Sequence, residues 1–118
     1  MVEASASPSN VPAPWSNPKG VDPEEAYVAA ISSCHMLVFL FAASKAGFAL
    51  THYRDEAVGV LTRTPQGVVW VSRVTLAPRI AWAGDKQPTP DDVARLHHAA
   101  HEGCFIANSV KTEIVVAQ

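Results

Sequence analysis

Two cysteines and their neighbouring histidines are the residues of this 118-residue sequence with the most distinctive chemistry. Cys34 is followed directly by His35, and Cys104 comes three residues after His101, about one helical turn. A thiolate can attack an oxidant, and a second thiol can condense with the resulting sulfenic acid to give a disulfide. If the two cysteines lie close together in space, they predict reversible thiol chemistry of the peroxidase kind.

The same residues also allow other interpretations. A buried cysteine is most often a small apolar side chain of the core. His97, His101 and Cys104 share one helix face, and Cys34 would complete a Cys2His2 zinc set, but the intervals differ from those of closely paired zinc ligands. We therefore expect neither a metal nor another cofactor.

The stretch 22–46 predicts one long helix that carries Cys34 near its middle. Asp22 can cap the helix, Pro23 suits its first position, and Gly47 can adopt the left-handed conformation that ends it. From residue 26 to residue 43 nearly every position is apolar, without the one-sided stripe of a surface helix. We therefore expect other elements to cover this helix on most sides.

The remaining elements predict an α+β domain spanning residues 1–118. Thr89 and Pro90 start a second helix at 89–109, which carries Cys104. Residues 52–83 predict a hairpin with its turn at 64–67, and residues 111–117 predict a closing strand. Residues 1–20 predict a short strand at 3–7 and a Pro-rich loop whose Trp15 packs onto the body. We expect a mainly antiparallel sheet packed on two long helices that carry the cysteines.

Composition excludes several classes of partner. Nine Lys and Arg against 11 Asp and Glu leave no basic footprint for nucleic acid and no polybasic membrane anchor. The longest unbroken apolar run, 36–43, is shorter than the roughly 18 to 20 residues of a spanning helix. The N-terminus lacks the basic start and apolar run of a secretory signal. The prediction is a soluble, cytoplasmic protein.

Two motifs resemble the OsmC/Ohr family. Asp-Pro-Glu-Glu-Ala-Tyr-Val-Ala-Ala-Ile-Ser-Ser-Cys-His at 22–35 is similar to the family's cysteine helix, and His-Glu-Gly-Cys at 101–104 is similar to its His-Glu-x-Cys motif. The resemblance implies an OsmC-like fold, an intertwined homodimer and a cysteine-dependent peroxidase of the oxidative stress response, active especially on organic hydroperoxides. It further implies Cys34 as the peroxidatic thiol, Cys104 as the resolving thiol, Glu24 as the helix-start glutamate and a dithiol reductant, for which a lipoyl-type dithiol is a candidate.

The sequence departs from the family in two places. Such proteins carry an N-terminal β-hairpin whose Arg helps to hold the reactive cysteine as a thiolate, whereas that hairpin has no evident counterpart here and the first Arg is Arg54. We expect His101 or a strand Arg, among Arg54, Arg63, Arg73 and Arg79, at the Cys34 sulfur. In addition, Phe105 follows Cys104 where many members have Pro, which indicates a divergent branch.

These residues lead to two functional hypotheses. The first is a hydroperoxide reductase whose substrate pocket is lined by residues near the cysteines, namely His35, Met36, Leu37, Phe39 and His101. The second is an OsmC-fold binding or interaction protein with weak or no peroxidase activity. Glu24 precedes Cys34 by ten residues, about 15 Å along a helix, so it would reach a shared site only from a partner chain or through another residue.

Overall fold

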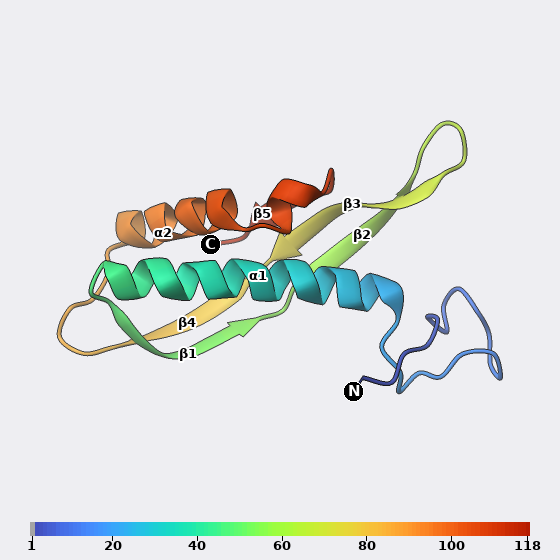
Figure 1. Cartoon of the computed structure of the whole chain (residues 1–118), viewed down its shortest axis with the longest axis horizontal. Coiled ribbons are helices and arrows are strands. Elements are labelled where there is room, and N and C mark those ends of the chain that lie inside the picture. Colours follow the sequence, from blue (N-terminus) through green and yellow to red (C-terminus); the bar gives the residue numbers. More distant parts are fainter. Residues whose placement is uncertain (1) are drawn as a thin grey trace.

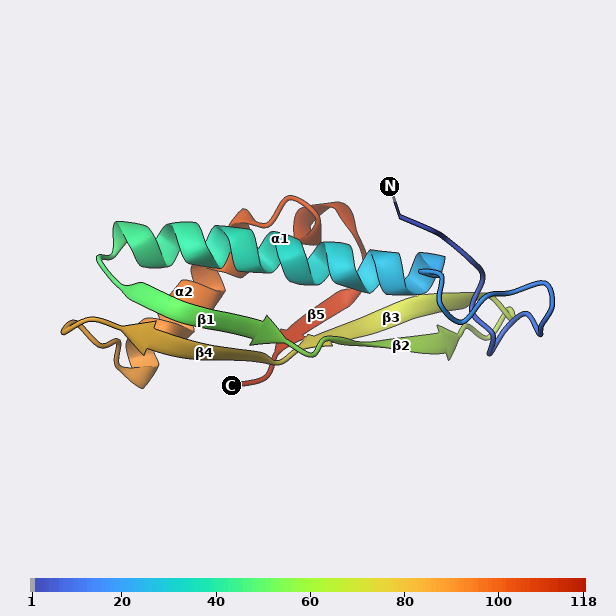
Figure 2. The same ribbon diagram turned by 90° about the horizontal axis from the view of Figure 1, so that it is seen from below.

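The computed structural model describes residues 2–118 and contains two helices, five strands and a short 3₁₀ turn (Figure 1). The molecule is elongated, with principal extents of 53 × 33 × 21 Å. Helix α1 (Pro23–Lys45) runs along one face of the strand layer, and α2 (Pro90–Gly103) packs beside α1 (Figures 1 and 2). This is the α+β arrangement that the sequence predicts.

Helix α1 is defined by local signals at both ends. The Asp22 carboxylate accepts a hydrogen bond of 2.7 Å from the Glu25 backbone N–H, and Pro23 occupies the first turn. Gly47 has φ of 86°, and the Phe48 N–H bonds back to the Ala43 carbonyl. The helix bounds therefore differ from the predicted 22–46 by only one residue at each end.

The predicted hairpin at 52–83 is present as a ribbon with a break in both arms. Strands β1 (Ala49–Asp55) and β2 (Val58–Arg63) form the outward arm, and β3 (Val69–Leu76) and β4 (Pro78–Ala83) form the return arm. β1 pairs with β4 in one antiparallel sheet, whereas β2 pairs with β3 in another (Figure 2). At the break the Asp55 carboxylate takes the place of a strand partner, because it accepts a hydrogen bond of 2.7 Å from the Ala77 N–H.

The closing strand β5 (Glu113–Val116) adds to β3 in parallel and makes the second sheet mixed. The N-terminal segment, by contrast, contributes only an isolated bridge between Ala4 and Val21, so the short strand predicted at 3–7 is reduced to one residue pair. Trp15 is 77% exposed. The expectation that it packs onto the body is wrong for this chain by itself.

Helix α2 begins as predicted but ends six residues earlier than the expected 89–109. Thr89 and Asp92 form a reciprocal capping box at its start. At its end Gly103 has low helix propensity, Cys104 is extended, and the Asn108 side chain donates to the Glu102 carbonyl at 2.9 Å. A separate 3₁₀ turn, η1 (Ala107–Ser109), follows. Cys104 therefore caps α2 and does not lie inside it.

The core consists of two clusters under α1. Phe39 and Ala43 of α1 pack with Leu96 and Ala100 of α2, and Ile31 packs with residues of β3. The fully buried positions of α1 recur every four residues, which marks a single stripe: Ile31, His35, Phe39 and Ala43.

The opposite face of α1 is apolar and open within one chain. Leu37 is 62% exposed and Phe41 is 65% exposed. By length and mean hydropathy α1 is the one helix within residues 2–118 that could cross a membrane, but core helices of soluble proteins meet the same criteria. The expectation that other elements cover α1 on most sides does not hold within a single chain.

Candidate active site

Cys34 and Cys104 lie side by side, although they are 70 positions apart in the sequence. Cys34 is half-buried in the middle of α1, and Cys104 is only 1% exposed at the end of α2. Close contact between the helices accompanies this approach. A Cβ on Gly103 would lie 3.1 Å from a methyl carbon of Val38, one turn beyond Cys34. The absent side chain of Gly103 thus lets the helices approach next to the thiols.

The two thiols differ in acidity because their surroundings differ. Burial opposes ionisation of Cys34, but the neighbouring Cys104 thiol and the backbone N–H groups of Ile106 and Phe105 outweigh it and lower the pKa of Cys34. Burial and the Cys34 sulfur raise the pKa of Cys104, against a hydrogen bond of 3.4 Å that the Ala107 N–H donates to its Sγ. The arrangement favours a Cys34 thiolate beside a protonated Cys104, which can donate to it.

The expected cation at the Cys34 sulfur is missing from the described residues. Within residues 2–118, the groups that lower the pKa of Cys34 are a thiol and backbone amides and include neither an arginine nor His101. Arg79 is exposed on β4. The other three strand arginines bind elsewhere: Arg54 pairs with Glu56, Arg63 donates to the Gly67 carbonyl and Arg73 pairs with Glu113.

His35 lies in the core, where it contacts a second histidine. Its Nε2 is 3.0 Å from Nδ1 of His97, and the two side chains are 1% and 4% exposed. Burial lowers the pKa of His35 to about 4, and His97 and His101 add to this effect while Asp55 opposes it. Burial also lowers the pKa of His97. Both rings are therefore neutral at pH 7, and one donates to the other.

The other residues assigned to a substrate pocket do not share one face. Phe39 is fully buried and its ring centroid lies 4.4 Å from that of His97, whereas Leu37 is exposed and Met36 is half-buried. His101 is exposed in the last turn of α2. Of these residues only Leu37 combines exposure with a place on the Cys34 side of α1, since it follows Cys34 by three positions.

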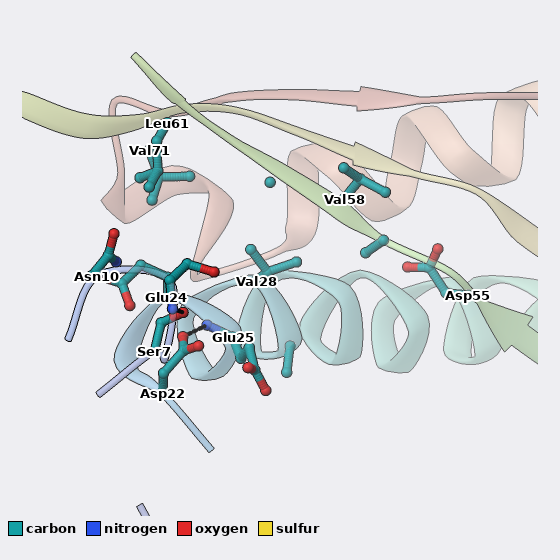
Figure 3. A pocket seen from close by; sticks show the side chains of 14 residues that line it. Ser7, Asn10, Asp22, Glu24, Glu25, Val28, Asp55, Val58, Leu61 and Val71 are labelled. Carbon is teal, nitrogen blue, oxygen red and sulfur yellow. Dashed lines mark hydrogen bonds between the residues drawn. The ribbon is translucent and has the colours of Figure 1, made fainter. Parts of the chain in front are cut away.

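Glu24 lines a different region, the cavity of about 610 Å³ at the start of α1 (Figure 3). The cavity is open to solvent and lined mainly by the N-terminal segment, the first turns of α1 and β2, and Figure 3 shows Glu24 near Ser7 and Asn10. Neither cysteine lines it. The structure therefore does not bring Glu24 to Cys34 within one chain.

The hypothetical Cys2His2 zinc set is not assembled. His97 turns its Nδ1 to His35, and no group of three His, Cys, Asp or Glu side chains within residues 2–118 converges as metal ligands would.

Comparison with known proteins places the chain in a family. The OsmC-like protein family model matches residues 16–118, so the chain belongs to the OsmC-like family. An OsmC-like protein of unknown function from Vibrio cholerae is 50% identical, with a TM-score of 0.95 over 98% of this chain and 75% of that one. None of the curated proteins matches the sequence.

More distant solved structures share the fold. An organic hydroperoxide resistance protein OsmC from Legionella pneumophila is 19% identical, with a TM-score of 0.70 over 94% of this chain and 74% of that one. The organic hydroperoxide resistance protein OhrB of Bacillus subtilis is also 19% identical, with a TM-score of 0.66 over 83% of this chain and 71% of that one.

Two features near the thiols were missed by reasoning from the sequence. The first is the pair of backbone amides at Phe105 and Ile106, which become available because α2 ends before them. The second is the bond between His35 and His97. The position of His97 on the same helix face as His101 is the one signal for this bond in the sequence, and it equally fits a pair of metal ligands.

Proposed function

We propose that this protein is a thiol-dependent peroxidase that reduces organic hydroperoxides through Cys34 and Cys104. The observation that carries the proposal is the adjacent pair of thiols with opposite pKa shifts, lowered for Cys34 and raised for Cys104. A nucleophile needs the thiolate, whereas a resolving thiol can remain protonated until it is used. The two roles are those that the family resemblance implies.

The cycle has three balanced steps. In the first step the Cys34 thiolate attacks the distal oxygen of ROOH and the O–O bond breaks, which oxidises Cys34 to sulfenic acid. The alkoxide takes up a proton and leaves as ROH. The Cys104 sulfur then attacks the Cys34 sulfur and displaces the hydroxyl group, which leaves as water with the Cys104 proton. A dithiol reduces the resulting disulfide and itself becomes a disulfide. The sum is ROOH plus dithiol giving ROH, water and oxidised dithiol.

Apolar surroundings favour an alkyl hydroperoxide over hydrogen peroxide. Phe105, whose backbone N–H faces the Cys34 sulfur, has a side chain that is 82% exposed, and Leu37 is exposed one turn along α1 from Cys34. These side chains can cover the alkyl group of a substrate and gain its buried apolar area. Two solved relatives of the same fold are named as organic hydroperoxide resistance proteins, which supports the same substrate class.

A second copy of the chain completes this proposal. The open apolar face of α1, with Leu37 and Phe41, requires a cover, and two-fold symmetric dimers are the commonest soluble oligomers. Glu24 would then act on the Cys34 of its partner. Sedimentation velocity at micromolar concentration is expected to show a dimer, and a monomer with full peroxidase activity would contradict this arrangement. The near-balanced charge of the sequence favours a protein without nucleic acid partners, and a cytoplasmic location remains our expectation.

One observation favours the alternative of a binding or interaction protein with weak activity. The Cys34 sulfur has no cation beside it within residues 2–118, whereas family members of the OsmC/Ohr type use an arginine there. Backbone amides and a thiol lower the pKa without supplying a full positive charge, so the thiolate fraction at neutral pH decides between the two functions.

Turnover with a dithiol reductant separates these functions. The protein, with Cys34→Ser as the control, is mixed with cumene hydroperoxide or hydrogen peroxide and either dihydrolipoamide or dithiothreitol, and peroxide loss is followed. We expect catalytic loss of cumene hydroperoxide that exceeds the loss of hydrogen peroxide and disappears in Cys34→Ser. Equal, slow loss of both peroxides in the wild type and in Cys34→Ser would refute the peroxidase and support the binding protein.

A further inference from the structure

The bond between His35 and His97 is a polar contact inside an apolar helix interface. Phe39 packs against both rings, with its centroid 4.4 Å from that of His97 and 6.5 Å from that of His35. The surrounding core is made of Phe39, Ala43, Leu96 and Ala100, and the two histidines are only 1% and 4% exposed, so water competes little for the bond between them. A buried polar group without a partner is strongly disfavoured, so each histidine requires the other.

The bond joins α1, which carries Cys34, to α2, whose C-cap is Cys104. His35 directly follows Cys34 on α1, and His97 lies on α2 seven residues before Cys104. Because α1 and α2 are stiff over these turns, fixing His35 against His97 also fixes the rotation and slide of α1 past α2. The distances from the Cys34 sulfur to Cys104 and to the backbone amides of residues 105 and 106 depend on this rotation and slide.

The neutral state of both rings makes this contact geometrically demanding. One N–H lies between Nε2 of His35 and Nδ1 of His97, at 3.0 Å and with ring planes 14° apart. A hydrogen bond weakens steeply as its angle departs from linear, so the pair tolerates little slide or rotation of the helices. Apolar contacts elsewhere in the interface are less directional.

We propose that His35 and His97 are positioning residues that hold Cys34 and Cys104 at reaction distance and keep the Cys34 sulfur against the backbone amides that favour its thiolate. This inference rests on the proposed thiol chemistry but adds residues to it. Neither histidine touches the substrate. Their effect reaches the sulfur through the relative placement of α1 and α2.

Four variants separate positioning from folding. His35→Leu/His97→Leu removes both polar partners together and so leaves no orphaned group, which keeps the protein stable. His97→Asn places an amide atom where Nδ1 stands and retains the bond, whereas His97→Leu breaks it. His98→Gln is the matched control, because His98 is exposed on the same helix and pairs with Glu102.

The first readout is the rate of Cys34 alkylation by iodoacetamide between pH 5 and pH 10, measured without peroxide in a Cys104→Ser background. In the double Leu variant and in His97→Leu the apparent pKa of Cys34 should rise by about one, which makes the neutral-pH alkylation rate about tenfold lower because only the thiolate reacts. His97→Asn and His98→Gln should follow the parent protein. If the double variant does not fold, the comparison of His97→Leu with His97→Asn carries the test.

The second readout is disulfide formation after one equivalent of cumene hydroperoxide, in chains that contain both cysteines. Slower conversion of sulfenic acid to disulfide in the Leu variants, with rescue by His97→Asn, supports positioning. An unchanged alkylation profile in the Leu variants overturns it, even if the wild type reduces peroxide well. A shifted profile with no peroxide reduction by the wild type supports the positioning pair and refutes the peroxidase instead.

Discussion

The buried histidine pair should make this protein lose stability as the pH is lowered, before the pH reaches the range in which its carboxylates titrate. The pKa of His35 is lowered from 6.5 to about 4 in the folded protein. The unfolded chain therefore binds a proton at this histidine below pH 6.5, whereas the folded protein binds it only below about pH 4. Stability therefore rises with pH across this window and is lost as the pH falls through it. The lowering of the His35 pKa from 6.5 to about 4 corresponds to a loss of about 3 kcal/mol in the free energy of unfolding at pH 4 relative to pH 7.

The assay is urea unfolding at pH 7, 6, 5 and 4, followed by circular dichroism. The control is His35→Gln/His97→Asn, which keeps an amide hydrogen bond in place of the pair but cannot titrate in this range. Asp22 and Asp92 have lowered pKa values as well, but their contribution is lost at lower pH and is common to both proteins. The wild type should lose about 3 kcal/mol more than the control between pH 7 and pH 4. Parallel pH profiles for the two proteins would refute the assignment of a buried, neutral pair.

Three further predictions concern single side chains. Cys104→Ser should react with cumene hydroperoxide at Cys34 and stop at sulfenic acid, trapped by dimedone; recovery of full dithiol-dependent turnover would contradict a resolving role. Asp22→Ala removes the cap of α1 and should lower the free energy of unfolding by about 1 kcal/mol, whereas Asp22→Asn should stay close to the wild type. Equal losses in the two variants would show that the cap bond is not the cause. Phe39→Ala leaves a cavity beside His97 and should lower the free energy of unfolding by about 3 to 5 kcal/mol in urea unfolding; a loss below about 1 kcal/mol would contradict the core described above.

Local signals in the sequence were enough to define the helices and their starts. Asp22 with Pro23 and Thr89 with Pro90 predict where α1 and α2 begin, because a cap depends on residues within one turn of itself. The two motifs also predict the family, which the match over residues 16–118 confirms. The end of α2 was less predictable, because the stop at Gly103 depends on the bond from Asn108 to the Glu102 carbonyl.

The surroundings of the thiols could not be predicted in the same way, because they depend on contacts between distant segments. His35 and His97 are 62 positions apart, and nothing in either local sequence indicates that they bond. The family resemblance predicts an arginine at Cys34, but three of the four strand arginines bind carboxylate or carbonyl partners nearby, and Arg79 is exposed on β4. The break in the ribbon likewise depends on a bond between Asp55 and Ala77 from opposite arms.

Mass spectrometry of a single turnover tests the central claim most directly. Reduced protein is mixed with one equivalent of cumene hydroperoxide at pH 7, quenched with iodoacetamide and digested. We predict a Cys34–Cys104 disulfide in the wild type, a dimedone-reactive Cys34 in Cys104→Ser, and unoxidised Cys104 in Cys34→Ser. Oxidation of Cys104 at the wild-type rate in Cys34→Ser, or a wild type whose two thiols stay alkylated and unoxidised, would contradict the account.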